Sequence, residues 1–247
     1  MYPSTKVYLV LGASSGIGRA AAQRLAKDGH AVVLGARRLP LCQDLAEELR
    51  SHGARADAVR VDLDVESELC EAVRFAQARF GGLSGAVNAA GILTPLGPIE
   101  AVDAEAAAQL LRTNVLGTLL AMKHQIPALA EGGAIVNVAS IVGRKTFPGT
   151  APYTASKLAM VGLTRVAAAE GAERGIRVNL VSPGPVVTAM AREAFGDEAS
   201  IHAAAASTPA RRAGQPEDIA DIIGFLLSEE ARHINGEEIV ADGGYIL

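Results

Sequence analysis

Short apolar segments alternate with longer amphipathic segments along nearly the whole chain. The short segments, such as "AVVLGA" and "AIVNVAS", are apolar at almost every position rather than at every second one. Strands of this kind are typical of a parallel sheet that helices cover on both faces. The pattern predicts strands at residues 7–11, 31–36, 54–61, 85–90, 134–139, 177–181 and 238–241.

The amphipathic segments between these strands predict helices near residues 17–28, 41–52, 65–80, 104–125, 153–174 and 216–228. Residues that favour helix ends support this: Asp64 as an N-cap, Gly81 and Gly82 as a stop, and Gln215 before Pro216 as a start. The alternation of strands and helices predicts an α/β fold with a doubly wound parallel sheet, Rossmann-like and in three layers.

The chain shows no internal repeat and no linker rich in Ser, Gly or Pro, so residues 1–247 are predicted to form a single domain. The segment 185–214 lacks a clear period. A stretch of this length outside the regular pattern is usually functional, and we predict a substrate-binding loop or lid.

The composition of the chain argues against several classes of protein. Acidic and basic residues are interspersed and the net charge is −4, which argues against a nucleic-acid partner. No apolar run is long enough to cross a bilayer, and residues 1–6 lead straight into an apolar stretch, so neither a membrane nor a secretory signal is expected. The two cysteines, Cys42 and Cys70, suit a reducing cytoplasm, and the scattered histidines predict no metal site.

A glycine-rich turn follows the first predicted strand. It reads "LGASSGIGRAAAQRL", with Gly12, Gly16 and Gly18 between the strand and a helix. Glycines at such a turn let backbone N–H groups approach a pyrophosphate at a helix N-terminus. We interpret the turn as a dinucleotide site; the alternative is a plain strand-to-helix turn that needs glycine.

The end of the second predicted strand bears on the choice of dinucleotide. An acid that would accept bonds from the adenosine ribose is absent there, and Ala36 is followed by Arg37 and Arg38. Guanidinium groups bind a 2′-phosphate that a carboxylate would repel, so NADP(H) is preferred over NAD(H). The alternative is that both arginines merely decorate an exposed helix start. Many NADP-preferring relatives have a basic residue where this chain has Ser15, so the predicted 2′-phosphate site depends on Arg37 and Arg38 alone.

Taken together, these features resemble the short-chain dehydrogenase/reductase family, of the single-domain Tyr-x-x-x-Lys type, over essentially the whole chain. The resemblance rests on the glycine turn at 12–18 and on "VDLDV" at 61–65, "VNAAG" at 87–91, "TNVLG" at 113–117, "IVNVAS" at 135–140, "YTASK" at 153–157, "RVNLVSPGPVVT" at 177–188 and "ADGG" at 241–244.

Tyr153 and Lys157 are four residues apart and therefore share one face of a helix. A nearby ammonium lowers the pKa of a phenol, which predicts a usable proton donor and acceptor. The resemblance implies that Tyr153 is the acid/base, that Lys157 tunes it and holds the nicotinamide ribose, and that Ser140 bonds the reacting oxygen. It also implies that Asn114 reaches Lys157 through a water; the alternative is a kink or polar plug in a long helix.

The resemblance also supplies the remaining contacts. Asn88 is expected to be partly structural, and the substrate residues are mostly apolar, which suggests an uncharged ketone or secondary alcohol. The expected cofactor contacts are Gly12, Ser14, Ser15, Gly16, Ile17, Gly18, Arg37, Arg38, Asp62, Leu63, Asn88, Ala89, Gly91, Tyr153, Lys157, Pro183, Gly184, Val186 and Thr188. The expected substrate contacts are Ser140, Ile141, Val142, Phe147, Val187 and Met190.

The predicted function is an NADP(H)-dependent oxidoreductase, a carbonyl reductase or alcohol dehydrogenase. The alternatives are an NAD-linked alcohol dehydrogenase of the same family, or a non-catalytic protein that senses a dinucleotide or acts as a scaffold. Residues 130–133 lack the basic side chains that often mark relatives acting on acyl-carrier-protein thioesters, and Arg144 and Lys145 are expected to be solvated loop charges. The family implies a homo-oligomer, a dimer or tetramer, with residues 234–247 partly buried between subunits.

Overall fold

The computed structural model describes residues 5–247, so residues 1–4, part of the segment at which no secretory signal is expected, lie outside it. Within that range, seven parallel strands form one sheet in the order β3-β2-β1-β4-β5-β6-β7. The predicted Rossmann-like α/β fold is confirmed. The strands are β1 (Val7–Leu11), β2 (Ala31–Ala36), β3 (Ala56–Arg60), β4 (Gly85–Asn88), β5 (Ala134–Val138), β6 (Arg177–Pro183) and β7 (Glu238–Ala241).

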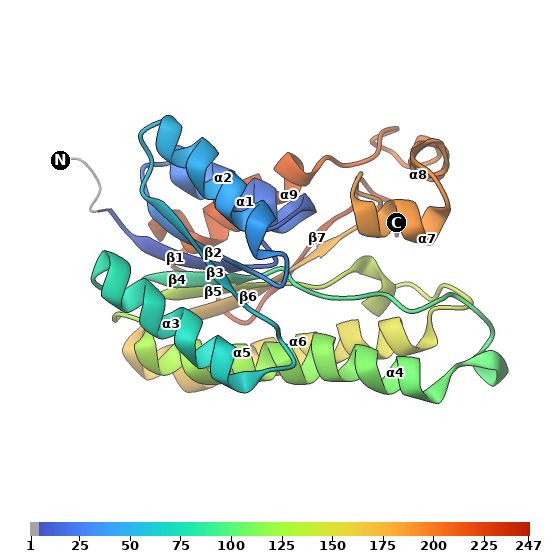
Figure 1. The fold of residues 1–247 in the computed structure, drawn as a ribbon. Coiled ribbons are helices and arrows are strands. Elements are labelled where there is room, and N and C mark those ends of the chain that lie inside the picture. Colours follow the sequence, from blue (N-terminus) through green and yellow to red (C-terminus); the bar gives the residue numbers. More distant parts are fainter. Residues whose placement is uncertain (1–4) are drawn as a thin grey trace.

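Helices cover both faces of the sheet, which gives three layers (Figure 1). One face carries α1 (Gly16–Lys27), α2 (Leu39–Ser51) and α9 (Pro216–Leu227); the other carries α3 (Glu66–Phe80), α4 (Ala104–Leu111), α5 (Gly117–Ala128) and α6 (Ala151–Gly171). Side chains of β1 pack on both faces of the sheet: Tyr8 and Val10 lie in the core under α1, and Leu9 lies in the core under α3. This is why its sequence is apolar throughout. Within residues 5–247, no helix combines the length and apolarity needed to cross a membrane.

Two of the three predicted helix ends are confirmed. Gly81 ends α3 in the left-handed region, and Gln215 begins α9 in a capping box with Asp218. Asp64 does not cap α3. Its carboxylate instead accepts hydrogen bonds from Thr113 Oγ1 at 2.9 Å and from Gln109 Nε2 at 2.5 Å. A tertiary contact thus replaced the local cap that the sequence suggested.

Two predicted segments differ in detail. The helix expected at 104–125 contains a π-helical turn, Arg112–Leu116, between α4 and α5. The segment 185–214, expected to be a loop or lid, contains two short helices, α7 (Ala189–Phe195) and α8 (Glu198–Ala206), capped by Thr188 and Asp197. Helices this short, and rich in alanine, carry too few apolar repeats to give a recognisable period.

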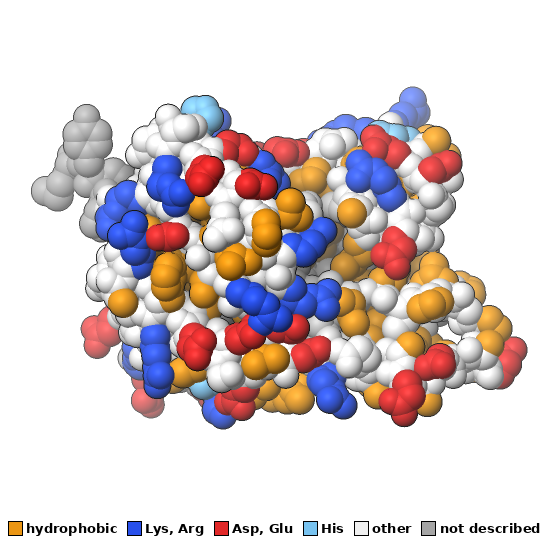
Figure 2. Space-filling view, viewed as in Figure 1, with side chains coloured by type: hydrophobic (Ala, Val, Ile, Leu, Met, Phe, Trp, Pro, Cys, Tyr) orange, Lys and Arg blue, Asp and Glu red, His pale blue; other side chains and the backbone are white. Residues whose placement is uncertain are grey.

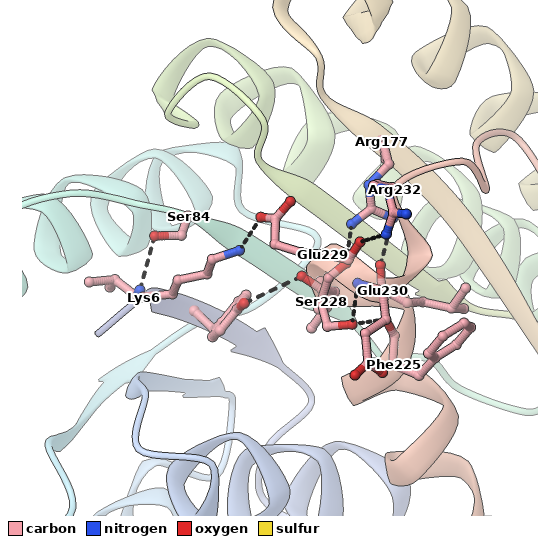
Figure 3. A network of polar contacts seen from close by, with 12 residues as sticks. Lys6, Ser84, Arg177, Phe225, Ser228, Glu229, Glu230 and Arg232 are labelled. Carbon is pink, nitrogen blue, oxygen red and sulfur yellow. Dashed lines mark hydrogen bonds and ion pairs between the residues drawn. The ribbon is translucent and has the colours of Figure 1, made fainter. Parts of the chain in front are cut away.

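Opposite the carboxyl ends of the strands, a buried polar network fixes the end of α9 (Figure 3). Arg177 of β6 donates to the carbonyl oxygens of Leu226 at 2.8 Å and Ser228 at 3.0 Å, and the Tyr8 hydroxyl donates to Leu227 at 3.5 Å. Helices end with carbonyl groups that lack intrahelical donors, and these side chains supply them. Burial lowers the pKa of Arg177 and raises the pKa of Tyr8 to about 12. The network is therefore structural.

Candidate active site

A cavity of about 670 Å³ opens at the carboxyl ends of the strands. It lies where β1 and β4 are neighbours and the chain order reverses, the position at which doubly wound sheets bind ligands. In Figure 2 the surface is hollowed between the body of the molecule and the part that carries α7 and α8, with hydrophobic side chains at the edge of the hollow. The lining runs from the glycine turn to Tyr245 near the C-terminus.

The glycine turn forms one end of this cavity. Gly12 has a φ of +87°, and a Cβ atom at this position would lie 2.6 Å from the backbone nitrogen of Ala90. Gly18 packs directly against the carbonyl oxygen of Gly12, which again leaves no room for a side chain. The first turn of α1 therefore faces the cavity with bare backbone. Its free N–H groups and positive potential suit a pyrophosphate.

The same end of the cavity carries positive charge. Arg37 and Arg38 both line it, and Arg38 Nη2 donates to Ser14 Oγ at 2.9 Å and to Ser15 Oγ at 2.8 Å. The Ser15 hydroxyl thus faces a guanidinium rather than capping α1. Hydroxyls, a guanidinium and a helix N-terminus converge here, so these residues fit the phosphate-bearing end of a dinucleotide.

The candidate catalytic residues lie further along the cavity. Ser140 follows β5, and its Oγ accepts the N–H of Val142 at 3.4 Å, so its own proton can be donated to Tyr153 or to a ligand. Tyr153 and Lys157 lie one turn apart on α6, and Lys157 Nζ is 5.4 Å from the centre of the Tyr153 ring. The Tyr153 hydroxyl contacts Met190 Sδ at 3.9 Å. Lys157 Nζ donates to the carbonyl oxygen of Val138 at 3.1 Å.

The electrostatics of this group differ from the sequence-based expectation. Burial lowers the pKa of Lys157 from 10.5 to about 8, because a buried ammonium loses its hydration. Burial also raises the pKa of Tyr153 to about 12, and the Ser140 hydroxyl acts weakly in the opposite direction. The prediction that Lys157 lowers the pKa of Tyr153 is therefore wrong for the protein by itself. Desolvation is the largest cause of the shift at both groups.

Asn114 lies in the π-helical turn and is almost fully buried. Its Oδ1 accepts the N–H of Ile92 at 2.8 Å, and its Nδ2 donates to the Ile92 carbonyl oxygen at 2.9 Å and to Ser156 Oγ at 3.3 Å. Asn114 is thus a buried polar side chain in an interrupted helix, which is the alternative that the sequence left open for this residue. Asn114 pins the segment after β4, and its relay to Lys157 stays a prediction.

Asn88 is also occupied by the protein itself. Its side chain exchanges hydrogen bonds with Gln125 and donates to Asn137 Oδ1 at 2.9 Å, in a buried network between β4, β5 and α5. It does not line the cavity; the structural part of its expected role is observed in this network, and its cofactor contact stays a prediction. Val187 does not line the cavity either. It packs with Ile201, Ala205 and Ala213 under α8.

The other predicted cofactor and substrate residues line this one cavity, although they come from segments spread over most of the chain. Several further lining residues were missed by the sequence analysis because no motif marks them. These are Leu93, Leu96, Pro148, Thr150 and Tyr245, whereas Phe195, which also lines the cavity, belongs to the segment 185–214 that the sequence predicted to bind substrate. Leu93 and Leu96 follow β4 at a distance that only the fold reveals. Tyr245 had been assigned, with the rest of residues 234–247, to a subunit interface.

Comparisons with known proteins agree with this geometry. A family model described as Enoyl-(Acyl carrier protein) reductase matches residues 12–246. The cyclohexanol dehydrogenase of Acinetobacter sp. (strain SE19) is 36% identical over 245 residues, which cover 98% of this chain and 95% of that protein.

Two solved structures are similar along their full length. A short-chain type dehydrogenase/reductase from Mycobacterium ulcerans matches with a TM-score of 0.92 and 32% identity, covering 97% of this chain and 89% of that one. A blue fluorescent protein from a metagenomic library, in complex with NADPH, matches with a TM-score of 0.90 and 30% identity, covering 98% of both chains. The chain therefore belongs to the short-chain dehydrogenase/reductase family of oxidoreductases.

Proposed function

We propose that the protein is an NADP(H)-dependent oxidoreductase that interconverts an uncharged ketone and a secondary alcohol. The observation that carries the proposal is the convergence of Ser140, Tyr153 and Lys157 on one cavity, with two arginines at its far end. Cyclohexanol dehydrogenase and a protein solved with NADPH are among the relatives, which supports both the chemistry and the cofactor.

The residues divide the proton chemistry between them. The Tyr153 phenol, with its pKa raised to about 12, is protonated at neutral pH and can donate to a carbonyl oxygen. Ser140 can donate its proton in a hydrogen bond to that same oxygen and stabilise developing negative charge. When bound, a nicotinamide dinucleotide supplies or accepts the hydride. When an alcohol is oxidised, Tyr153 must accept the proton of the alcohol, so the phenol must first be deprotonated. Alcohol oxidation is therefore favoured at high pH.

The preference for NADP(H) rests on Arg37 and Arg38. A 2′-phosphate beside them would receive charge-assisted hydrogen bonds, whereas a ribose hydroxyl would gain little. Arg38 is the better placed of the two, because its guanidinium already bonds Ser14 and Ser15 at the glycine turn.

Calorimetric titration with NADPH and with NADH tests the cofactor proposal. We expect NADPH to bind more tightly, and Arg38→Ala to weaken NADPH binding by about ten- to a hundredfold, while NADH binding changes little. Arg74→Ala, which removes the same charge from an exposed position on α3, is the control. Equal or tighter binding of NADH by the wild-type protein would instead favour an NAD-linked alcohol dehydrogenase.

A non-catalytic dinucleotide sensor or scaffold is the alternative from another class. Such a protein has no chemical need for a phenol, a hydroxyl and an ammonium around one cavity, so their presence favours turnover. We propose that the enzyme is cytoplasmic, because Cys42 and Cys70 are free thiols, which suit a reducing compartment.

We also propose a homo-oligomer, a dimer or tetramer. Apolar side chains lie exposed along the outer faces of α5 and α6: Leu119, Leu158 and Val166, the last two with 49% and 56% of their surface accessible. Leu158 and Val166 are two turns apart and share one face of α6. Light scattering of Leu158→Glu should show a smaller species than the wild type. An unchanged mass would exclude this face as the interface.

A further inference from the structure

The last six residues return to the cavity after β7. The Asp242 carboxylate accepts the N–H groups of Gly244 at 2.8 Å and Ile246 at 3.0 Å, which closes a tight turn. Gly184, below the cavity, packs directly against Asp242 and donates its N–H to Ala241 at 3.0 Å. The C-terminus lies beside α7 in Figure 1. This turn is thus an ordered part of the site, and it places the Tyr245 side chain in the cavity lining.

Tyr245 is held by the loop that follows Ser140. Lys145 Nζ donates to the Tyr245 carbonyl oxygen at 3.3 Å and lies 5.1 Å from the centre of its ring. The same ammonium is 6.0 Å from the Phe147 ring, and the two rings are 6.1 Å apart at an angle of 31°. We call Phe147 and Tyr245, with Lys145 over them, the aromatic wall.

A second contact fixes the aromatic wall relative to Ser140. Arg144 Nε pairs with Glu238 Oε2 at 2.9 Å, and Ser182 Oγ donates to Glu238 Oε1 at 2.6 Å. The Glu238 side chain is only 6% accessible, so this pair is better shielded from water than ordinary surface pairs. Arg144 and Lys145 are therefore structural ties between the Ser140 loop and the C-terminal segment. Both side chains remain exposed to solvent, as the sequence predicted, and these contacts come in addition.

The chemistry of the cavity changes along its length. The charged lining residues are Arg37, Arg38 and Asp62 at the glycine-turn end and Lys157 beneath Tyr153. Among residues 5–247, the lining beyond Tyr153 carries no ionised side chain; it includes Leu93, Leu96, Met190 and Phe195 as well as the two rings of the aromatic wall. Lys145 donates to the Tyr245 carbonyl oxygen and does not itself line the cavity, so a carboxylate bound there would lose its hydration without a cation in the lining to replace it, which is costly.

We propose that Tyr245 is a specificity-determining residue, and that the aromatic wall selects uncharged cyclic ketones over small acyclic and anionic ones. The inference rests on the proposed function, because it assumes that a ketone occupies the cavity beside Tyr153. The two rings, tilted by 31° to each other, give a ring-shaped substrate a large apolar surface to lie against, whereas a short acyclic ketone covers little of it.

Kinetics of Tyr245→Ala with cyclohexanone and with 2-butanone test the selectivity. We expect kcat/KM for cyclohexanone to fall roughly tenfold or more, and for 2-butanone to change less than about threefold. Tyr245→Phe keeps the ring and should retain the preference. Leu247→Ala is the control, because Leu247 is 99% accessible and belongs to the same turn. Equal losses for both ketones would overturn the proposal.

A matched pair of probes tests the charge requirement. The methyl ester of 4-oxocyclohexanecarboxylic acid and the free carboxylate have similar bulk and differ in charge. We expect the ester to be preferred by about a hundredfold, since the carboxylate must be desolvated without a partner. Equal use of the two would overturn the proposal that the cavity excludes anions.

A binding measurement separates this inference from the proposed function. Cyclohexanone and NADP+ cannot react with each other, so ketone binding to the NADP+-loaded protein can be followed by NMR titration without turnover. If Tyr245→Ala binds cyclohexanone roughly tenfold more weakly than the wild type does, the role of the aromatic wall is supported. If in addition the wild type reduces no ketone, only the proposed function is refuted. Equal affinities of the two proteins for cyclohexanone would overturn the aromatic wall.

Discussion

Replacing Lys157 by methionine should make the protein respond differently to pH, because burial lowers the pKa of this lysine from 10.5 to about 8. Between these two values the unfolded chain binds a proton at this position that the folded protein does not bind. Unfolding then takes up a proton, so the stability of the wild type rises with pH across this window. Below about pH 8 the folded protein holds a buried ammonium, and the full free-energy cost of desolvating this charge lowers its stability.

The size of this cost follows from the same two values. At about 1.4 kcal/mol for each pKa unit, the charged Lys157 destabilises the folded state by about 3 kcal/mol at neutral pH. Roughly 2 kcal/mol of this is recovered between about pH 7 and about pH 9.5. The hydrogen bond from Lys157 to Val138 and the contact with Met160 offset part of the cost, but methionine removes them equally at both pH values.

Urea unfolding of the wild type and Lys157→Met at about pH 7 and about pH 9.5 measures the effect. The free energy of unfolding of the wild type minus that of the variant should increase by about 2 kcal/mol over this range. The range stays below 10, above which the raised pKa of Tyr153 makes stability fall with pH. Lys27→Met, at an exposed position on α1, serves as the control and should give a constant difference. A constant difference for Lys157→Met as well would refute the account of a desolvated ammonium.

Three further substitutions test the site and its support. Tyr153→Phe should lower kcat by a factor of about a thousand or more while leaving the dissociation constant for NADPH nearly unchanged, and full activity in this variant would exclude Tyr153 as the acid/base. Ser140→Ala should lower kcat by about a hundredfold with little effect on cofactor binding, as single-turnover kinetics would show. Arg177→Leu leaves the carbonyls at the end of α9 without donors and should cost about 2–4 kcal/mol in urea unfolding; unchanged stability would mean that water replaces the guanidinium.

The sequence alone determined the three layers of the fold and the succession of strands and helices along the chain. Strands that are buried on both faces are apolar throughout, and this local property is visible in segments such as 31–36 and 134–139. The glycine turn could also be predicted from the sequence, because only a residue without a side chain fits at Gly12 and Gly18. Tyr153 and Lys157 share a helix face by spacing alone. The family's motifs then extended the site to residues that local patterns do not connect.

Tertiary structure decided whatever depends on competition between distant partners. Asp64 could cap a helix, but Thr113 and Gln109 offered better bonds. Lys157 could lower the pKa of Tyr153, but burial of the phenol raises it, and burial of Lys157 lowers the pKa of the ammonium itself. Arg144 and Lys145 are exposed loop charges, and only β7 and the C-terminal turn bring Glu238 and the Tyr245 carbonyl to them.

Tyr245 illustrates the limit most clearly. Nothing in "ADGGYIL" marks its tyrosine as part of a cavity, because the neighbours that place it there come from residues about a hundred positions earlier. Local sequence specifies backbone conformation and which face is apolar. Which side chains meet across the carboxyl edge of the sheet is set by strand order and by the packing of long-range loops, and only the folded chain contains that information.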